Sequence, residues 1–182
     1  MAPLPSNSKN RITKPKAKPS KSNKTKKAAA ADRIMTDVLL AIRSIHLGNI
    51  ASRCKNHEYR KYRLRDGVKR LWFYETGADG GRSSITHIAV IPASIRHEPG
   101  SVPTEPFGIG NEDFNAGRKE SKYGYPILEL YELVKPVSLA EMQAKWAMSG
   151  APKGWCYVGS ALWTDRWGKD DSDRDQKVKK IF

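Results

Sequence analysis

The chain has 182 residues, of which 33 are Lys or Arg and 19 are Asp or Glu, so its formal net charge is +14. That length suits one domain with extensions, because domains of about 100–150 residues are the commonest size. No segment approaches the ~18 consecutive apolar residues of a membrane span. The only cysteines, Cys54 and Cys156, offer neither a disulfide framework nor a metal knuckle. We therefore expect a soluble protein of a reducing, intracellular compartment, without a membrane partner.

The positive charge is concentrated at the N-terminus. Residues 1–30 contain nine Lys or Arg and no acid, which leaves 24 basic and 19 acidic residues, a net charge of +5, in the remainder. Because it has little apolar surface to offset its ordering entropy, we expect residues 1–31 to form a disordered Lys/Pro-rich basic tail. Its charge suits a polyanion, and the run Lys24–Lys27 is typical of a nuclear-import signal. We expect residence in the nucleus, with the cytoplasm as the alternative.

After the basic tail, apolar and aromatic runs alternate with turn signals. Val38–Ile42 suits a buried strand or part of a helix, and periodicity does not separate the two over so short a run. Ser44–Cys54 follows with apolar residues at helical spacing. Five later runs have the β-branched and aromatic composition of strands: Asn56–Leu64, Arg70–Glu75, Ile85–Ile91, Ile127–Leu133 and Trp155–Val158.

A long connection separates the third and fourth of these runs. Residues 93–124 are rich in Gly, Pro and Asn and predict a loop with one short helix at Asn111–Ala116, and loops of this length are often functional. Pro136 follows the next strand. Ser138 and Glu141 then form a capping-box pattern that starts a helix.

The pattern of elements predicts the fold class. Several short strands and few helices favour a small mixed barrel over a parallel α/β fold. Trp155–Val158 is expected to be the last strand of that barrel. Beyond Thr164 the charges are mixed, so we expect residues 165–182 to be a loosely held charged tail in which Lys177–Phe182 forms at most a weak helix.

One segment resembles the motif of a known family. Arg53–Arg60 (RCKNHEYR) matches the Lys, Glu and Arg of the pattern Gly-x-Lys-x-x-Glu-x-Arg, which lies at the end of a helix and along the next strand. Together with Leu71–Gly77 and Ile127–Leu139, it resembles the ASCH family of PUA-like domains. Gly108–Gly117 is similar to fungal members. Arg53 stands where the family has Gly, which leaves the tight turn at that point open.

The resemblance covers roughly residues 36–164 and implies a fold and a function. The fold is α+β, a small PUA-like β-barrel with flanking short helices, and we assign it residues 32–164. It lies between the disordered basic tail and the charged C-terminal tail. The implied function is binding of nucleic acid, RNA or DNA, in a cleft beside the motif, with a modified or flipped base as one candidate ligand.

The motif residues have the chemistry for such binding. Glu58 and Arg60 share one face of the expected strand, and Lys55 precedes them. Arg offers a planar fork, Glu accepts from a base amine, and Lys supplies a point charge. The same three residues can instead pair with one another and merely fix the turn. The predicted nucleic-acid-binding residues, in which basic and aromatic side chains interleave, are Lys55, Glu58, Tyr59, Arg60, Lys61, Tyr62, Arg63 and Arg65.

Two other functions stay open. Some ASCH proteins are amidohydrolases that act on acetylated cytidine through Lys, Thr and Glu; Lys55 matches that Lys and would be catalytic, but Glu58 stands in place of the Thr. A protein-interaction adaptor, with a peptide held by residues 93–124, is the other alternative. The four histidines lack metal-ligand spacing, so we expect no metal and no cofactor. We expect a monomer that binds rather than catalyses.

Overall fold

A computed structural model of the chain describes residue 1 and residues 32–182. The predicted basic tail and its run Lys24–Lys27 lie outside the described residues, so they stay predictions from the sequence. None of the described helices is long and apolar enough to cross a membrane.

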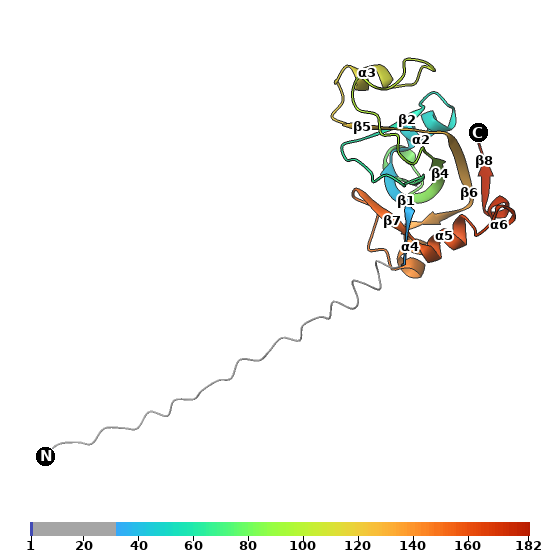
Figure 1. Ribbon diagram of the computed structural model, residues 1–182. Coiled ribbons are helices and arrows are strands. Elements are labelled where there is room, and N and C mark those ends of the chain that lie inside the picture. The colour runs from blue at the N-terminus through green and yellow to red at the C-terminus, as the bar shows by residue number, and fades with distance from the viewer. Residues whose placement is uncertain (2–31) are drawn as a thin grey trace.

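Six strands form one mixed sheet in the order β7-β1-β3-β4-β6-β8 (Figure 1). Their bounds are Arg33–Ile42 (β1), Arg70–Glu75 (β3), Ser84–Val90 (β4), Glu129–Ser138 (β6), Trp155–Gly159 (β7) and Val178–Lys180 (β8). β1 and β3 are parallel, and the other neighbours are antiparallel. Two further strands, β2 (His57–Arg60) and β5 (Tyr123–Pro126), form a separate antiparallel pair.

Short helices connect the strands and cover the two ends of the molecule. Their bounds are Ser44–Ala51 (α2), Asn111–Asn115 (α3), Leu139–Trp146 (α4), Ser160–Arg166 (α5) and Asp171–Lys177 (α6), with a 3-10 turn at Ala78–Gly80. β2, β5 and α3 lie at one end of the molecule, whereas α4 and α5 lie at the opposite end (Figure 1). As the capping-box pattern predicted, the Ser138 side chain accepts a hydrogen bond from the Glu141 N–H, 3.2 Å away, at the start of α4.

The six-stranded sheet is buried on both faces, which explains the continuous apolar run in β1. Val38 and Leu40 pack into a core with Phe73 on one side of the sheet, whereas Leu39 packs with Trp72 on the other side. Successive residues of a strand point to opposite faces, so a strand buried on both sides needs apolar residues throughout. The run Val38–Ile42 is therefore a strand rather than a helix.

The α+β class is confirmed, but the strands do not close into a barrel. Within residues 32–182, β7 pairs only with β1, and β8 pairs only with β6, so the hydrogen-bonded sheet is open. The strand β7 was expected to be the last of the fold and is instead an edge strand beside the first. The expected barrel is thus replaced by an open sheet with a second two-stranded sheet at one end.

Three expectations about elements are corrected. β6 continues through Pro136, because its register with β4 shifts between Ile85 and His87 and leaves Pro136 in an irregular stretch that needs no ladder bond. β5 begins in the last two residues of the connection expected to be a loop. The expected C-terminal tail instead forms the end of α5, then α6 and β8, in which Val178 is 5% exposed and packs into the core.

Candidate nucleic-acid interface

The site is built on the tight turn between α2 and β2. Arg53 has a φ of 62°, in the left-handed region that suits the motif's glycine. Its N–H donates to the Ile50 carbonyl at 2.9 Å, and the Lys55 N–H donates to the Asn49 carbonyl at 2.8 Å. A left-handed conformation costs a non-glycine residue about 1–2 kcal/mol. The turn is therefore kept, with an exposed and strained arginine in it.

Lys55, Glu58 and Arg60 form one buried ion cluster. Lys55 Nζ lies 2.5 Å from Glu58 Oε2, and Arg60 Nη2 lies 2.8 Å from Glu58 Oε1. Arg60 Nη2 also donates to the Ala41 carbonyl at 2.7 Å. The side chains are 8%, 7% and 19% exposed in that order. The three residues thus pair with one another, which was the alternative to an open cleft.

The charges of the cluster balance the effect of burial. Burial alone raises the pKa of the Glu58 carboxyl, but Lys55 and Arg60 outweigh it and lower that pKa overall. Burial also lowers the pKa of the Lys55 amine, against the opposing pull of Glu58. Glu58 therefore stays ionised and holds both cations in place.

The two predicted stacking tyrosines already have partners inside the protein. The Tyr59 ring centroid lies 4.5 Å from that of Phe114, and its hydroxyl donates to Asn111 Oδ1 at 2.6 Å. Tyr62 packs against the core, near Trp155. Neither ring stands free in solvent as a stacking surface.

Three predicted cations lie on the exposed connection between β2 and β3. Lys61 pairs with Glu120, and Arg63 pairs with Asp66 at 2.9 Å. Arg65 makes no ion pair within residues 32–182. Two of these three charges are thus partly neutralised by carboxylates.

Two small hollows flank Lys55. One, of about 250 Å³, is edged by His46, Lys119 and Ser121. The other, of about 230 Å³, is edged by Arg53 and by two residues that sequence reasoning missed: Phe107 and Phe182. Lys119 was missed as well. It reaches the site from the long connection after α3 and lies 5.7 Å from the centroid of the Tyr59 ring. Composition predicted a functional loop there but not which residues it brings to the motif.

Solved structures with a similar fold include those of ZmASCH from Zymomonas mobilis. A serine-to-alanine variant of ZmASCH from Zymomonas mobilis superposes with a TM-score of 0.52 at 15% identity, over 74% of this chain and 94% of that one. A tyrosine-to-phenylalanine variant of the same protein gives 0.53 at 13% identity, over 71% and 95%. The chain has the ASCH fold. No protein-family model matches the sequence, and no curated protein matches it significantly, so this likeness concerns the fold alone.

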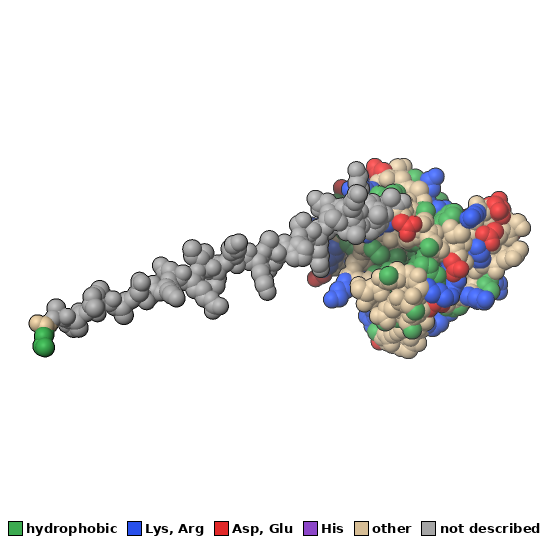
Figure 2. Space-filling model, turned by 90° about the horizontal axis from the view of Figure 1, so that it is seen from below, with side chains coloured by type: hydrophobic (Ala, Val, Ile, Leu, Met, Phe, Trp, Pro, Cys, Tyr) green, Lys and Arg blue, Asp and Glu red, His purple; other side chains and the backbone are tan. Residues whose placement is uncertain are grey.

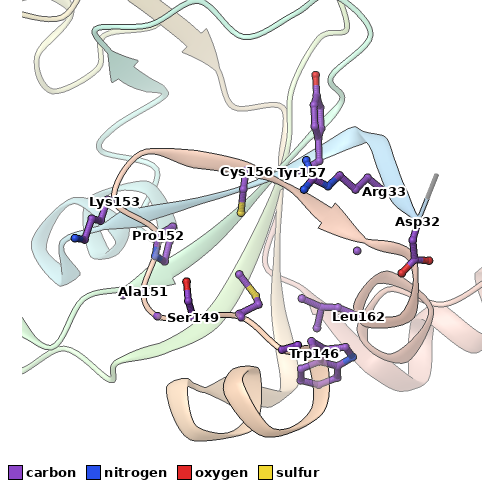
Figure 3. Close-up of a pocket in the computed structure, with 14 residues that line it drawn as sticks. Asp32, Arg33, Trp146, Ser149, Ala151, Pro152, Lys153, Cys156, Tyr157 and Leu162 are labelled. Atoms are coloured by element: carbon purple, nitrogen blue, oxygen red, sulfur yellow. The ribbon is translucent and has the colours of Figure 1, made fainter. Parts of the chain in front are cut away.

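A larger hollow of about 670 Å³ lies at the opposite end of this ASCH fold. Cys156 and Tyr157 of β7 border it with Trp146 of α4 and Leu162 of α5, close to Arg33 at the start of β1 (Figure 3). None of the predicted binding residues lines it. Among the described residues, no group of three or more His, Cys, Asp or Glu is placed to hold a metal ion.

Proposed function

We propose that the chain is a nucleic-acid-binding member of the ASCH family, of the fungal PUA-like type that the motif resembles. One observation carries the proposal: Lys55 lies between two hollows whose outer cations, Arg53 and Lys119, pair with no carboxylate in residues 32–182. Unpaired cations around a concave surface attract phosphates. Residence in the nucleus through Lys24–Lys27 and action as a monomer belong to the same proposal.

The motif cluster has a supporting role in this proposal. Glu58 fixes Lys55 and Arg60 by direct ion pairs, and Arg60 uses part of its fork on the Ala41 carbonyl inside the protein. An ammonium has three donors. Lys55 gives one to Glu58 and lies 5.4 Å from the centroid of the Tyr59 ring, and we expect a ligand in either hollow to accept from the remaining donors. Base selectivity therefore rests on the rims of the hollows rather than on Arg60.

The folded part lacks the large excess of positive charge that would attract polyanions without a specific site. On the face seen in Figure 2, basic and acidic side chains are interspersed rather than separated. The net charge of the chain outside residues 1–30 is only +5. Binding by the folded part must therefore depend on a few local cations, which single substitutions can test.

Lys119→Ala is the direct test. It should weaken binding to oligonucleotides several-fold and lower the salt slope of log K by about 0.7–0.9, the share of one neutralised phosphate. Lys153→Ala is the matched control, because Lys153 is an exposed cation beside the hollow at the opposite end. Fluorescence anisotropy titrations over a series of salt concentrations measure both quantities. Equal losses in the two variants, or no binding by the full chain at low salt, would contradict the proposal.

Amide hydrolysis of an acetylated cytidine is a second candidate, favoured by the state of Lys55. Its amine is buried, its pKa is lowered by that burial, and it borders a hollow of about 250 Å³. Incubation of the chain with N4-acetylcytidine, followed by chromatography, separates the two functions. Turnover that Lys55→Arg abolishes would establish the hydrolase, whereas no turnover leaves Lys55 as a binding residue.

A further inference from the structure

We propose that Phe107 is a stacking residue for an unpaired base, which makes the ligand of this site single-stranded nucleic acid. The inference rests on the proposed function and names its substrate class. Phe107 is 69% exposed, more than any other large hydrophobic residue in residues 32–182. It lies on the connection between β4 and α3, next to the turn that carries Arg53 and Lys55.

The segment around Phe107 is clamped to that turn on both sides. Asn56 Nδ2 donates to the Pro106 carbonyl at 2.8 Å, and the Ile109 N–H donates to the Cys54 carbonyl at 2.8 Å. These bonds hold the backbone that carries the exposed ring, so a ligand loses less free energy in ordering this segment.

Gly108 makes this clamp possible. A Cβ atom at position 108 would lie 2.1 Å from Asn56 Oδ1 and 2.8 Å from Asn56 Nδ2. The amide of Asn56 therefore lies directly against the backbone beside Phe107, where any other residue would push it away. The local sequence thus fixes the backbone beside Phe107, whose ring is exposed to solvent.

Phe107 borders a hollow on each of two sides. The first is the hollow of about 230 Å³ with Arg53 and Lys55, in which the Arg53 guanidinium carbon lies 5.0 Å from the centroid of the Phe182 ring. The second, of about 470 Å³, also includes Asn111 and Thr104. A ring that borders two hollows, one of which has the Arg53 cation without a carboxylate partner in residues 32–182, suits successive bases and their phosphates.

Asn111 supplies an independent sign of a ligand. Its side chain borders the second hollow and the residue is only 4% exposed, yet its Nδ2 has no hydrogen-bond partner among the described residues. A buried donor without a partner is costly. A small turn of the Asn111 side chain towards this hollow would bring the donor to an acceptor on a base.

These features together favour a single strand over a duplex. In a duplex the bases stack on one another and offer no free face to a protein ring, whereas single strands expose those faces to aromatic side chains. Base–aromatic stacking tolerates many sequences, so the site should prefer strandedness over a particular base. An apolar peptide would fit the ring but would leave Arg53 and Lys119 without a counter-charge.

The test compares oligonucleotides of equal phosphate number with the full chain. We expect a short single strand to bind more tightly than the duplex of the same sequence. Phe107→Ala should weaken single-strand binding about tenfold and leave duplex binding unchanged. With abasic residues throughout the strand, wild type and Phe107→Ala should bind alike, because the phosphates remain and the bases do not.

Matched variants separate stacking from general apolar contact. Phe107→Trp should keep the preference for single strands, and Phe107→Leu should lose it. Ile95→Ala, at a residue 47% exposed, is the control and should change nothing. Because Phe107 is exposed, thermal melts should be alike for all variants. If Phe107→Ala or Phe107→Leu binds single strands as tightly as wild type, the inference is wrong. If Lys119→Ala still weakens binding in the same assay, the proposed function stands. Absence of all binding overturns both.

Discussion

Glu58 holds two cations within a nearly closed part of the protein. Each carboxylate oxygen has its own partner, Lys55 on one and Arg60 on the other. A buried ion pair stabilises little compared with apolar packing, but removal of one partner leaves an uncompensated charge. Truncation of one residue of the cluster should therefore destabilise the fold more than substitution of an exposed charged residue nearby.

Arg60→Ala should lower the free energy of unfolding by about 3 kcal/mol, because Glu58 loses a partner and the Ala41 carbonyl loses a donor. Urea denaturation measures the change. Arg65→Ala, at an exposed position without an ion pair in residues 32–182, should stay within about 0.5 kcal/mol of wild type. A cost for Arg60→Ala as small as that for Arg65→Ala would show that the cluster is not a structural unit.

At this scale the sequence predicted the neighbours but not the direction of the side chains. Period two placed Glu58 and Arg60 on one face of a strand, and the ion pair between them confirms that placement. Nothing in the local sequence indicates that β1 passes near β2 and offers the Ala41 carbonyl to Arg60. Whether Arg60 faces a ligand or the protein depends on residues far away in the chain.

The turn between α2 and β2 shows how an element tolerates an unfavourable residue. Arg53 keeps the left-handed conformation that the family's glycine would adopt, at an energetic cost. The cost is offset by its surroundings, where the N–H bonds of Arg53 and Lys55 close the turn. The strained turn thereby keeps an exposed cation, Arg53, beside Phe107.

Arg53→Gly should raise the free energy of unfolding by about 0.5–1 kcal/mol, since relief of strain exceeds the greater chain entropy of glycine. It should also weaken single-strand binding several-fold, because the cation is lost. Arg53→Ala separates the two effects: it loses the charge but keeps the strain. Denaturation and anisotropy titrations on both variants measure them. Equal stability of Arg53→Gly and Arg53→Ala would mean that the turn is not strained.

Among the elements, those with strong local patterns were predicted and those defined by distant partners were not. The span of β3 and the start of α4 agree closely with the apolar and capping signals. β5 contains Gly124 and Pro126, residues that strands disfavour, and exists because β2 pairs with it. β8 is only three residues long and depends on β6 in the same way.

The folded part of the molecule has a modest net charge. The N-terminal segment, residues 1–31, carries most of the net positive charge of the chain. Deletion of residues 1–31 should weaken binding to single strands and duplexes by the same factor. It should also flatten the salt dependence, by ~0.7–0.9 in slope for each phosphate that the segment neutralises. The ratio of single-strand to duplex affinity should not change, because Phe107 and Arg53 remain. A truncated chain that kept the full salt slope would show that the segment binds no phosphate.

The point at which this segment joins the fold sets how the two can act together. The Asp32 carbonyl accepts a hydrogen bond from the Ser160 N–H, 2.9 Å away, at the start of α5, and α5 lies at the end opposite β2, β5 and α3 (Figure 1). Thirty-one residues span at most ~100 Å, against a radius of gyration of about 15 Å for a domain of this size.

On the proposed function, the hollows beside Phe107 and the basic segment would be two tethered ligand-binding modules that start from opposite ends of the fold. Once the hollows hold a strand, the segment meets the rest of that strand at a raised effective concentration, provided the strand is long enough to reach around the fold. Short strands would then engage one module and long strands both, so we expect the affinity to rise with the length of the unpaired strand.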